Sequence, residues 1–105
     1  MPTSKHKAVK YDEGKLRYDL VPTEALADIV GVFTYGAGKY GTRNWEQGIE
    51  ASRLYAAVHR HLAAYWSGEN SHNESGLSHL AHAGCDILML LQSSRIPTAV
   101  DDRPR

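Results

Sequence analysis

The sequence has little of three things: cysteine, long apolar runs and net charge. Its 105 residues include one cysteine, Cys85, which excludes an intramolecular disulfide and favours a reducing compartment. No run of about 18 apolar residues occurs, so we expect no membrane span. The first ten residues, MPTSKHKAVK, lack the apolar core of a secretion signal. We therefore expect a cytoplasmic protein with no membrane partner.

The charges cancel, with 12 basic and 12 acidic residues. A neutral chain lacks the broad positive field that binding of duplex nucleic acid needs, so we expect no such partner. Local basic clusters can still hold a small anion. The histidines are unevenly spread, because five of the six fall between positions 59 and 82.

The spacing of apolar residues predicts an all-α fold with three main helices. The first begins at Pro22 and Thr23, since proline suits a first helical turn, and ends near the glycine-rich YGAGKYG at 35–41. Its apolar stripe is Leu26, Ile29, Val30 and Phe33. The second helix is expected at about 50–67, and the third at about 75–93 with Ser75 as its N-cap.

One domain fits this length. We expect residues 1–9 to form a flexible N-terminal tail, 10–95 a single helical domain that includes an irregular N-terminal arm, and 96–105 a C-terminal tail. Three short helices make a thin bundle with a small core. We therefore expect the bundle to be completed by homo-oligomerisation.

The third helix carries polar groups opposite its apolar stripe. At about 100° per residue, His79, His82 and Asp86 fall within an arc of roughly 60°. The stripe on the other side is Leu77, Leu80, Gly84, Ile87, Leu88 and Leu91. A polar face is often just solvated, but Met89 and Leu90 flank this one, and a helix that is apolar on both sides is usually covered on both sides. The spacing therefore favours a covered junction.

The second helix adds His61, which lies among apolar residues; alone, such a histidine is more often a hydrogen-bonded core residue than a metal ligand. If the second and third helices pack antiparallel, His61 and the loop acids Glu69 and Glu74 approach the polar face of the third helix. Imidazole and carboxylate groups together suit divalent ions. The expected metal ligands are His61, Glu69, His79, His82 and Asp86. We expect Mn²⁺ or Mg²⁺, with Zn²⁺, Fe²⁺ and Co²⁺ as alternatives.

The first half of the chain sets cations beside aromatic rings, a combination that suits a nucleotide, with charge for phosphate and rings for the base. The alternative is an ordinary surface, on which lysines are solvated and rings pack on the core. GAGKYG at 36–41 lacks the spacing of a P-loop. The candidate substrate-binding residues are Lys10, Lys15, Arg17, Lys39, Tyr40, Asn44, Trp45 and Arg60.

Four segments in order, KYDEGKLRYDLVP, TYGAGKYGTRNW, RHLAAYWSGE and ESGLSHLAHA, resemble the phage dATP/dGTP diphosphohydrolase N-terminal domain family, over about residues 9–92. The resemblance implies a phage protein in the host cytoplasm that hydrolyses a purine deoxynucleoside triphosphate to the monophosphate and pyrophosphate with a divalent metal. It also implies similarity to MazG-like all-α pyrophosphohydrolases, which assemble as dimers or tetramers.

The resulting hypothesis is a nucleoside triphosphate pyrophosphohydrolase acting on dGTP or dATP. The metal would activate water, with Glu69 or Glu74 as general base. The alternative hypothesis is a non-catalytic phage module that sequesters a nucleotide signalling molecule, which requires the basic and aromatic half but no metal.

Overall fold

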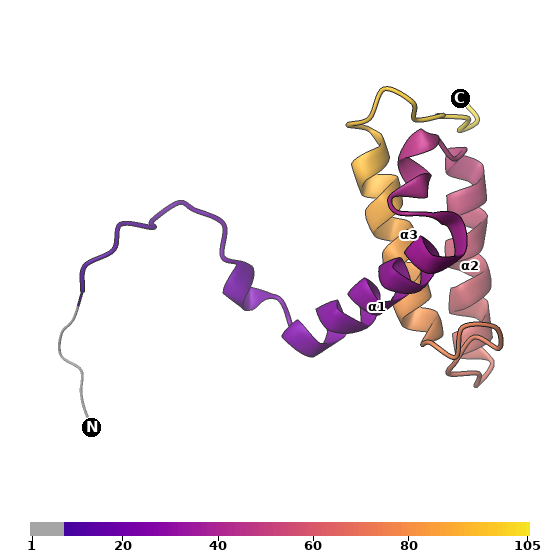
Figure 1. Ribbon diagram of the computed structural model, residues 1–105, viewed down its shortest axis with the longest axis horizontal. Helices are drawn as coiled ribbons and strands as arrows, with labels where there is room; N and C mark the ends of the chain where they lie inside the picture. Colours follow the sequence, from indigo (N-terminus) through magenta and orange to yellow (C-terminus); the bar gives the residue numbers. More distant parts are fainter. Residues whose placement is uncertain (1–7) are drawn as a thin grey trace.

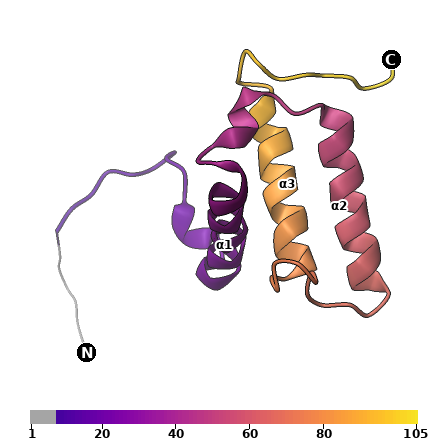
Figure 2. The same cartoon turned by 45° about the vertical axis from the view of Figure 1, so that its right-hand side comes forward.

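The computed structural model describes residues 8–105 and has three α-helices: α1 (Thr23–Tyr40), α2 (Ala51–Trp66) and α3 (His79–Ser93). Two 3₁₀ turns, η1 (Tyr18–Leu20) and η2 (Asn44–Gln47), precede α1 and α2. Figures 1 and 2 show α2 and α3 as an antiparallel pair, with α1 packed across α3. The all-α expectation is confirmed. No helix in the described part is long and apolar enough to cross a membrane.

The first helix ends within the glycine-rich segment where its end is expected. It continues through Gly36 and Gly38 and ends at Tyr40, where Gly41 takes a φ of 101° and donates its N–H to the carbonyl of Ala37. A helical glycine costs only about 1 kcal/mol relative to alanine, so two of them do not stop a helix. The terminating feature is the glycine just beyond Tyr40, because it adopts the positive φ that side chains disfavour.

The third helix begins four residues later than expected, at His79. Its N-cap is Ser78, whose Oγ accepts hydrogen bonds from the backbone N–H groups of Leu80 and Ala81 at 3.1 and 3.2 Å. Ser75, the expected cap, lies in the preceding loop instead, where its Oγ accepts from the N–H of Leu77. The loop therefore uses both serines, one to close a turn and one to start the helix.

The polar side of α3 is covered, as expected, but much of its apolar stripe stays exposed. The polar side, including His79 at 4 % exposure, packs against α2, and Ala81 and Cys85 are buried beside α1. At Gly84 a Cβ would lie 2.7 Å from Cδ1 of Ile29, so the missing side chain lets α1 approach closely. The members of the expected apolar stripe that stay exposed are Leu80, Ile87, Leu88 and Leu91.

The two ends of the chain behave differently. Residues 8–21 form an arm that leaves the bundle (Figure 1); most of the expected 1–9 tail lies outside the described residues. The expected C-terminal tail instead returns to the start of α2. Val100 accepts a hydrogen bond from the N–H of Ala51, and the Asp102 carboxylate accepts from the N–H of Ser52 at 2.8 Å. Asp102 thus satisfies an N-terminal donor of α2 from 50 residues away.

This return path makes Gly48 a specific structural requirement. Its φ is 109°, and an added Cβ would lie 2.5 Å from the carbonyl oxygen of Thr98. We expect Gly48→Ala to lower the free energy of unfolding by about 1–3 kcal/mol, because alanine is strained there and displaces the C-terminal segment. Gly31→Ala is the matched control: it lies in α1 with no atom near its Cβ position, and should stabilise by about 0.5–1 kcal/mol. Urea denaturation measures both, and equal effects of the two substitutions would contradict this account.

Candidate functional site

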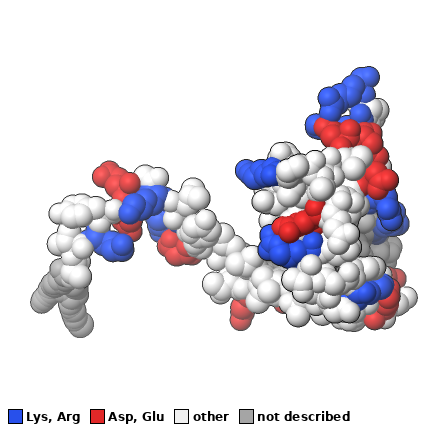
Figure 3. Space-filling model, turned by 45° about the horizontal axis from the view of Figure 1, so that its top comes forward, with Lys and Arg blue, Asp and Glu red and all other residues white. Residues whose placement is uncertain are grey.

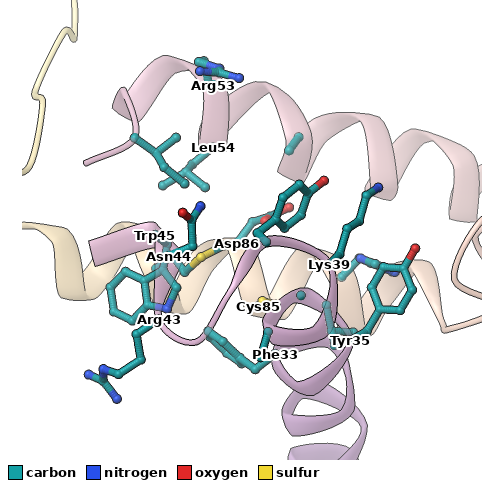
Figure 4. Close-up of a pocket in the computed structure, with 18 of the residues that line it drawn as sticks. Phe33, Tyr35, Lys39, Arg43, Asn44, Trp45, Arg53, Leu54, Cys85 and Asp86 are labelled. Carbon is teal, nitrogen blue, oxygen red and sulfur yellow. The ribbon is translucent and has the colours of Figure 1, made fainter. Parts of the chain in front are cut away.

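A cleft of about 1480 Å³ lies among α1, the 41–49 segment, α2 and α3. Figure 4 looks into it, with Phe33 and Lys39 from α1, Trp45 from η2, Leu54 from α2 and Asp86 from α3. Three of the six histidines also line the cleft: His61, His72 and His82. Helix α1 lines the cleft from Val32 to its last residue, Tyr40, so its glycine-containing C-terminal part belongs to the site.

Aromatic rings and cations are interleaved on the α1 side of the cleft. The rings of Phe33 and Trp45 meet edge to face, with centroids 6.5 Å apart. The Arg43 guanidinium lies 5.8 Å from the Trp45 ring, and Lys39 Nζ lies 5.1 Å from the Tyr40 ring. Such geometry is attractive because the negative ring face meets a positive charge. It also leaves flat apolar surface beside positive charge.

The basic side chains of the cleft differ in what neutralises them. Lys39 pairs with Glu74 at 2.5 Å, Arg43 pairs with Glu46, and Arg53 lies 3.4 Å from Glu50. Arg60, on α2, makes no salt bridge with any described residue. Within the described cleft it is therefore the cation most available to an incoming anion. Figure 3 shows acidic and basic side chains interspersed on the face in view.

The histidine cluster consists of His61 from α2, His72 from the α2–α3 loop, and His79 and His82 from α3. The rings of His61 and His82 are stacked, with centroids 4.6 Å apart and planes 11° apart. The ring of His72 lies 5.0 Å from that of His82 and 5.5 Å from that of His61. Four imidazoles from α2, α3 and the loop between them thus gather at one place, while Leu54 and Val58 are the buried side chains of α2.

A hydrogen-bonded chain runs through this cluster. Nδ1 of His61 lies 2.9 Å from Nδ1 of His79, and Nε2 of His79 lies 2.6 Å from Oε1 of Glu69. An ionised carboxylate only accepts, so His79 donates from Nε2; a neutral His79 then accepts at Nδ1 the proton that His61 donates. This order of protons leaves Nε2 of His61 with a free lone pair.

The other two histidines are held by Ser75. The Oγ of Ser75 lies 2.7 Å from Nε2 of His82, and the N–H of Ser75 donates to Nδ1 of His72 at 3.3 Å. The loop that carries Glu69, His72 and Ser75 therefore orients three rings of the cluster. Neither His72 nor Ser75 is among the site residues expected from the sequence. The density of histidines between 59 and 82 was a signal for His72, whereas Ser75 was expected only as a helix cap.

Burial sets the protonation of the cluster. It lowers the pKa of His61 to about 4, with the neighbouring imidazoles adding to the effect. Burial likewise lowers the pKa of His82. At neutral pH both rings are uncharged, which is the form that donates a lone pair to a metal ion.

The pKa values of two α3 residues next to the cluster are raised instead of lowered. Burial raises the pKa of Asp86 to about 6, although the nearby charge of Arg60 opposes the shift. Burial and the adjacent Asp86 raise the pKa of the Cys85 thiol to about 12, so this cysteine stays protonated. A protonated buried thiol is a poor nucleophile.

The expected site residues divide into two groups. Those brought to the cleft or to the histidine cluster beside it are Lys39, Tyr40, Asn44, Trp45, Arg60, His61, Glu69, Glu74, His79, His82 and Asp86. Lys10, Lys15 and Arg17 instead lie together in a separate hollow of the arm, and Arg17 is paired with Asp19 at 2.8 Å. The arm leaves the bundle, so these three cations are not part of this chain's own cleft.

The donors near the cluster have the chemistry of a divalent metal site, with imidazoles and a carboxylate side by side. Their present arrangement is different: within residues 8–105, no three His, Cys, Asp or Glu side chains converge as a metal ion requires. His79 uses both ring nitrogens in hydrogen bonds. The donor types fit a metal ion, and in this structure the imidazoles contact one another through ring packing and one hydrogen bond.

The shifted groups predict a specific dependence of stability on pH. The lowered pKa of His61 contributes to the free energy of unfolding; this contribution is fully present above pH 6.5 and is lost as the pH falls through 4. The raised pKa of Asp86 gives a second contribution, which is fully present below pH 3.8 and is lost as the pH rises through 6. The two oppose each other in the overlapping range. Asp86→Asn should therefore make unfolding free energy fall more steeply on acidification than in wild type, and His61→Gln less steeply. Urea titrations across this range measure the slopes, and unchanged slopes in both variants would refute the assignment.

Comparison with known proteins agrees with the resemblance seen in the sequence. The family model described as "dATP/dGTP diphosphohydrolase, N-terminal" matches residues 5–103. A Salmonella phage PMBT28 protein named dATP/dGTP diphosphohydrolase is 32 % identical over 95 residues, which cover 90 % of this chain and 32 % of that protein. The chain thus spans about a third of the relative's length, and no solved structure matches it. The match over nearly all of its residues places this chain in the dATP/dGTP diphosphohydrolase N-terminal family.

Proposed function

We propose that the cleft binds a purine deoxynucleoside triphosphate, dGTP or dATP, and hydrolyses it to the monophosphate and pyrophosphate. Membership of the family supports the substrate class. The observation that carries the proposal is that Arg60, the aromatic rings and the histidine cluster face one cleft. A nucleotide needs all three features: positive charge for phosphate, rings for the base, and polar donors at the reacting phosphorus.

The phosphates are the part of the substrate that Arg60 would hold. Its guanidinium is free of carboxylate partners in the described residues, whereas the cations at Lys39 and Arg53 are already paired. A planar guanidinium binds phosphate oxygens through two parallel hydrogen bonds. The base would then stack near Trp45 and Tyr40, with the Asn44 amide as a hydrogen-bonding group for base or sugar.

We propose His61, His79 and His82, with Glu69 and Asp86, as the residues that would hold a divalent ion; three imidazoles suit Mn²⁺, Zn²⁺, Fe²⁺ or Co²⁺ better than Mg²⁺, which prefers oxygen ligands. Bound there, the ion supplies neutralisation of phosphate charge and a more acidic water. The uncharged state of His61 at neutral pH supports this role, because its Nε2 lone pair needs no deprotonation first. In the hydrogen-bonded chain, Glu69 orients His79, as carboxylates orient metal-binding histidines elsewhere.

The reaction itself requires water to attack the α-phosphorus. The new P–O bond forms as the bond from that phosphorus to the oxygen bridging the β-phosphorus breaks, and pyrophosphate leaves. The water proton passes to a base, for which Glu69 is the better of the two expected carboxylates. Glu74 is paired with Lys39, and this contact lowers the pKa of Glu74 and so weakens it as a base. Arg60 stabilises the charge that develops on the phosphoryl oxygens.

One observation favours the second candidate, a non-catalytic nucleotide-sequestering module: no three metal-binding side chains converge in the described residues. Calorimetry distinguishes the two functions. Tight binding of dGTP in the presence of a chelator, with the nucleotide recovered intact, would support sequestration. Pyrophosphate release from dGTP or dATP that depends on added Mn²⁺ or Mg²⁺ would support the hydrolase.

The histidine cluster has a matched control on the same helix. His59 lies two residues before His61 but is exposed, and its ring packs at a tilt against that of Tyr55, with centroids 4.5 Å apart. We expect His61→Ala to lower metal-dependent pyrophosphate release by roughly 10- to 100-fold, the effect of disturbing a metal site, while His59→Ala leaves it unchanged. Circular dichroism checks that both variants stay helical. Equal activity in the two folded variants would place the chemistry elsewhere.

The role of Arg60 has a similar control. Arg60→Gln should reduce kcat/KM by roughly 10²-fold, because it removes the cleft cation that makes no salt bridge within residues 8–105. Arg53→Gln changes a cation on the same helix that is paired with Glu50, so it should change kcat/KM by only about twofold. Steady-state kinetics with dGTP measures both. If Arg53→Gln proves the more damaging substitution, the phosphates lie at the other end of α2.

A further inference from the structure

The loop between α2 and α3, residues 67–78, makes one polar contact with α1. The Nζ of Lys39, in the last turn of α1, lies 2.5 Å from Oε2 of Glu74 in the loop. Among the hydrogen bonds and salt bridges of residues 8–105, this contact alone joins the loop to α1. Leu77, near the other end of the loop, packs against the apolar core instead. Lys39 and Glu74 both line the cleft, so the pair holds the middle of the loop at the cleft wall.

The surroundings of Lys39 are those of an anion site. Its Nζ lies 5.1 Å from the centre of the Tyr40 ring and 6.0 Å from that of the Tyr35 ring. Figure 4 shows Tyr35 and Lys39 among the side chains of the cleft. Partial burial and, after it, the charge of Glu74 raise the pKa of the Tyr35 hydroxyl, which therefore stays protonated and can donate. An ammonium group beside a hydroxyl donor suits a phosphate oxygen as it suits a carboxylate oxygen.

The pair between Lys39 and Glu74 is open to exchange. The two side chains are 35 and 55 % exposed, and ion pairs this accessible to water contribute little to stability. The Lys39 contact lowers the pKa of Glu74, so the carboxylate is ionised at neutral pH and carries a single negative charge. The phosphates of a nucleotide carry several charges, and Arg60 lines the same cleft and attracts them too. An incoming polyphosphate therefore competes well with Glu74 for Lys39.

The residue after Glu74 connects this pair to the histidine cluster. The Oγ of Ser75 lies 2.7 Å from Nε2 of His82, and its N–H donates to Nδ1 of His72 at 3.3 Å. Consecutive Cα atoms are only about 3.8 Å apart, so a shift of the backbone at Glu74 moves Ser75 as well. Release of Glu74 from Lys39 thus changes the contacts that orient two of the four rings.

We propose that Lys39 and Tyr35 form a phosphate subsite that Glu74 occupies in the free protein. A phosphate group of the nucleotide displaces the Glu74 carboxylate, and the middle of the 67–78 loop is released from α1. The inference rests on the proposed function for the class of ligand. It adds to Arg60 a second cation that is exposed to phosphate only when the ligand is present, and it makes Glu74 a competitor of the ligand.

The first experiment measures binding of inorganic pyrophosphate by calorimetry with a chelator present, so that neither metal nor turnover is needed. Glu74→Gln should tighten binding by roughly 3- to 5-fold, because the neutral amide does not hold Lys39 away from the anion. Glu46→Gln is the matched control, since it removes the same charge from a pair with another cleft cation, Arg43. It should change the affinity by no more than about 1.5-fold. Lys39→Met should abolish the gain from Glu74→Gln when the two are combined.

Four results would overturn the subsite: no tighter binding by Glu74→Gln, an equal gain by Glu46→Gln, a gain that persists without Lys39, or no pyrophosphate binding by any folded variant. Circular dichroism identifies the folded variants. Failure of the proposed hydrolysis has a different signature, in which dGTP and dATP stay intact with added metal while these differences in pyrophosphate binding remain.

The second experiment tests the release of the loop. At saturating pyrophosphate, the imidazole ¹⁵N resonances of His72 and His82 should shift, while those of His59 stay in place because His59 is exposed on α2 and outside the cluster. Lys39→Met at saturating pyrophosphate should show neither shift. Unmoved His72 and His82 resonances in the saturated wild type, or equal shifts in Lys39→Met, would overturn the displacement of Glu74.

Discussion

The pairing of α2 with α3 depends on a chain of hydrogen bonds that passes through the buried imidazole of His79. His61, His79 and Glu69 connect the two helices through contacts of 2.9 and 2.6 Å, and His79 is nearly inaccessible to solvent. A buried polar group without a partner destabilises a fold, so each ring is satisfied by the next. This junction specifies the register of the helices, because a shift by one turn would leave several ring nitrogens unpaired.

The same junction gives the cleft its chemistry. Burial keeps His61 on α2 and His82 on α3 neutral, so neither ring adds positive charge to the cleft at neutral pH. Among the cleft cations, those at Lys39, Arg43 and Arg53 are matched by nearby carboxylates. An anion entering the cleft therefore meets a local field dominated by Arg60, next to the donor groups that the proposed reaction needs.

The core outside this junction is small. Its buried apolar residues are Val32, Leu54, Val58, Ala81, Ala83 and Cys85, and the missing side chain of Gly84 lets Ile29 of α1 approach closely. Several apolar side chains of α1 and α3 stay exposed, among them Val30 and Leu91, and the arm of residues 8–21 leaves the bundle. The histidine cluster lies between α2 and α3, and apolar side chains of α1 and α3 face solvent.

The apolar periodicity of the sequence was sufficient to determine the helices, and the motif order was sufficient to determine the family. Local chemistry also indicated that His61, Glu69, His79 and His82 meet, since an antiparallel pair of helices with a short loop brings them together. The tertiary structure alone decided the rest. Contacts between residues distant in sequence, which no local pattern encodes, decided three features. These are the exposure of much of the apolar stripe of α3, the return of Asp102 to α2, and the separation of Lys10, Lys15 and Arg17 from the cleft.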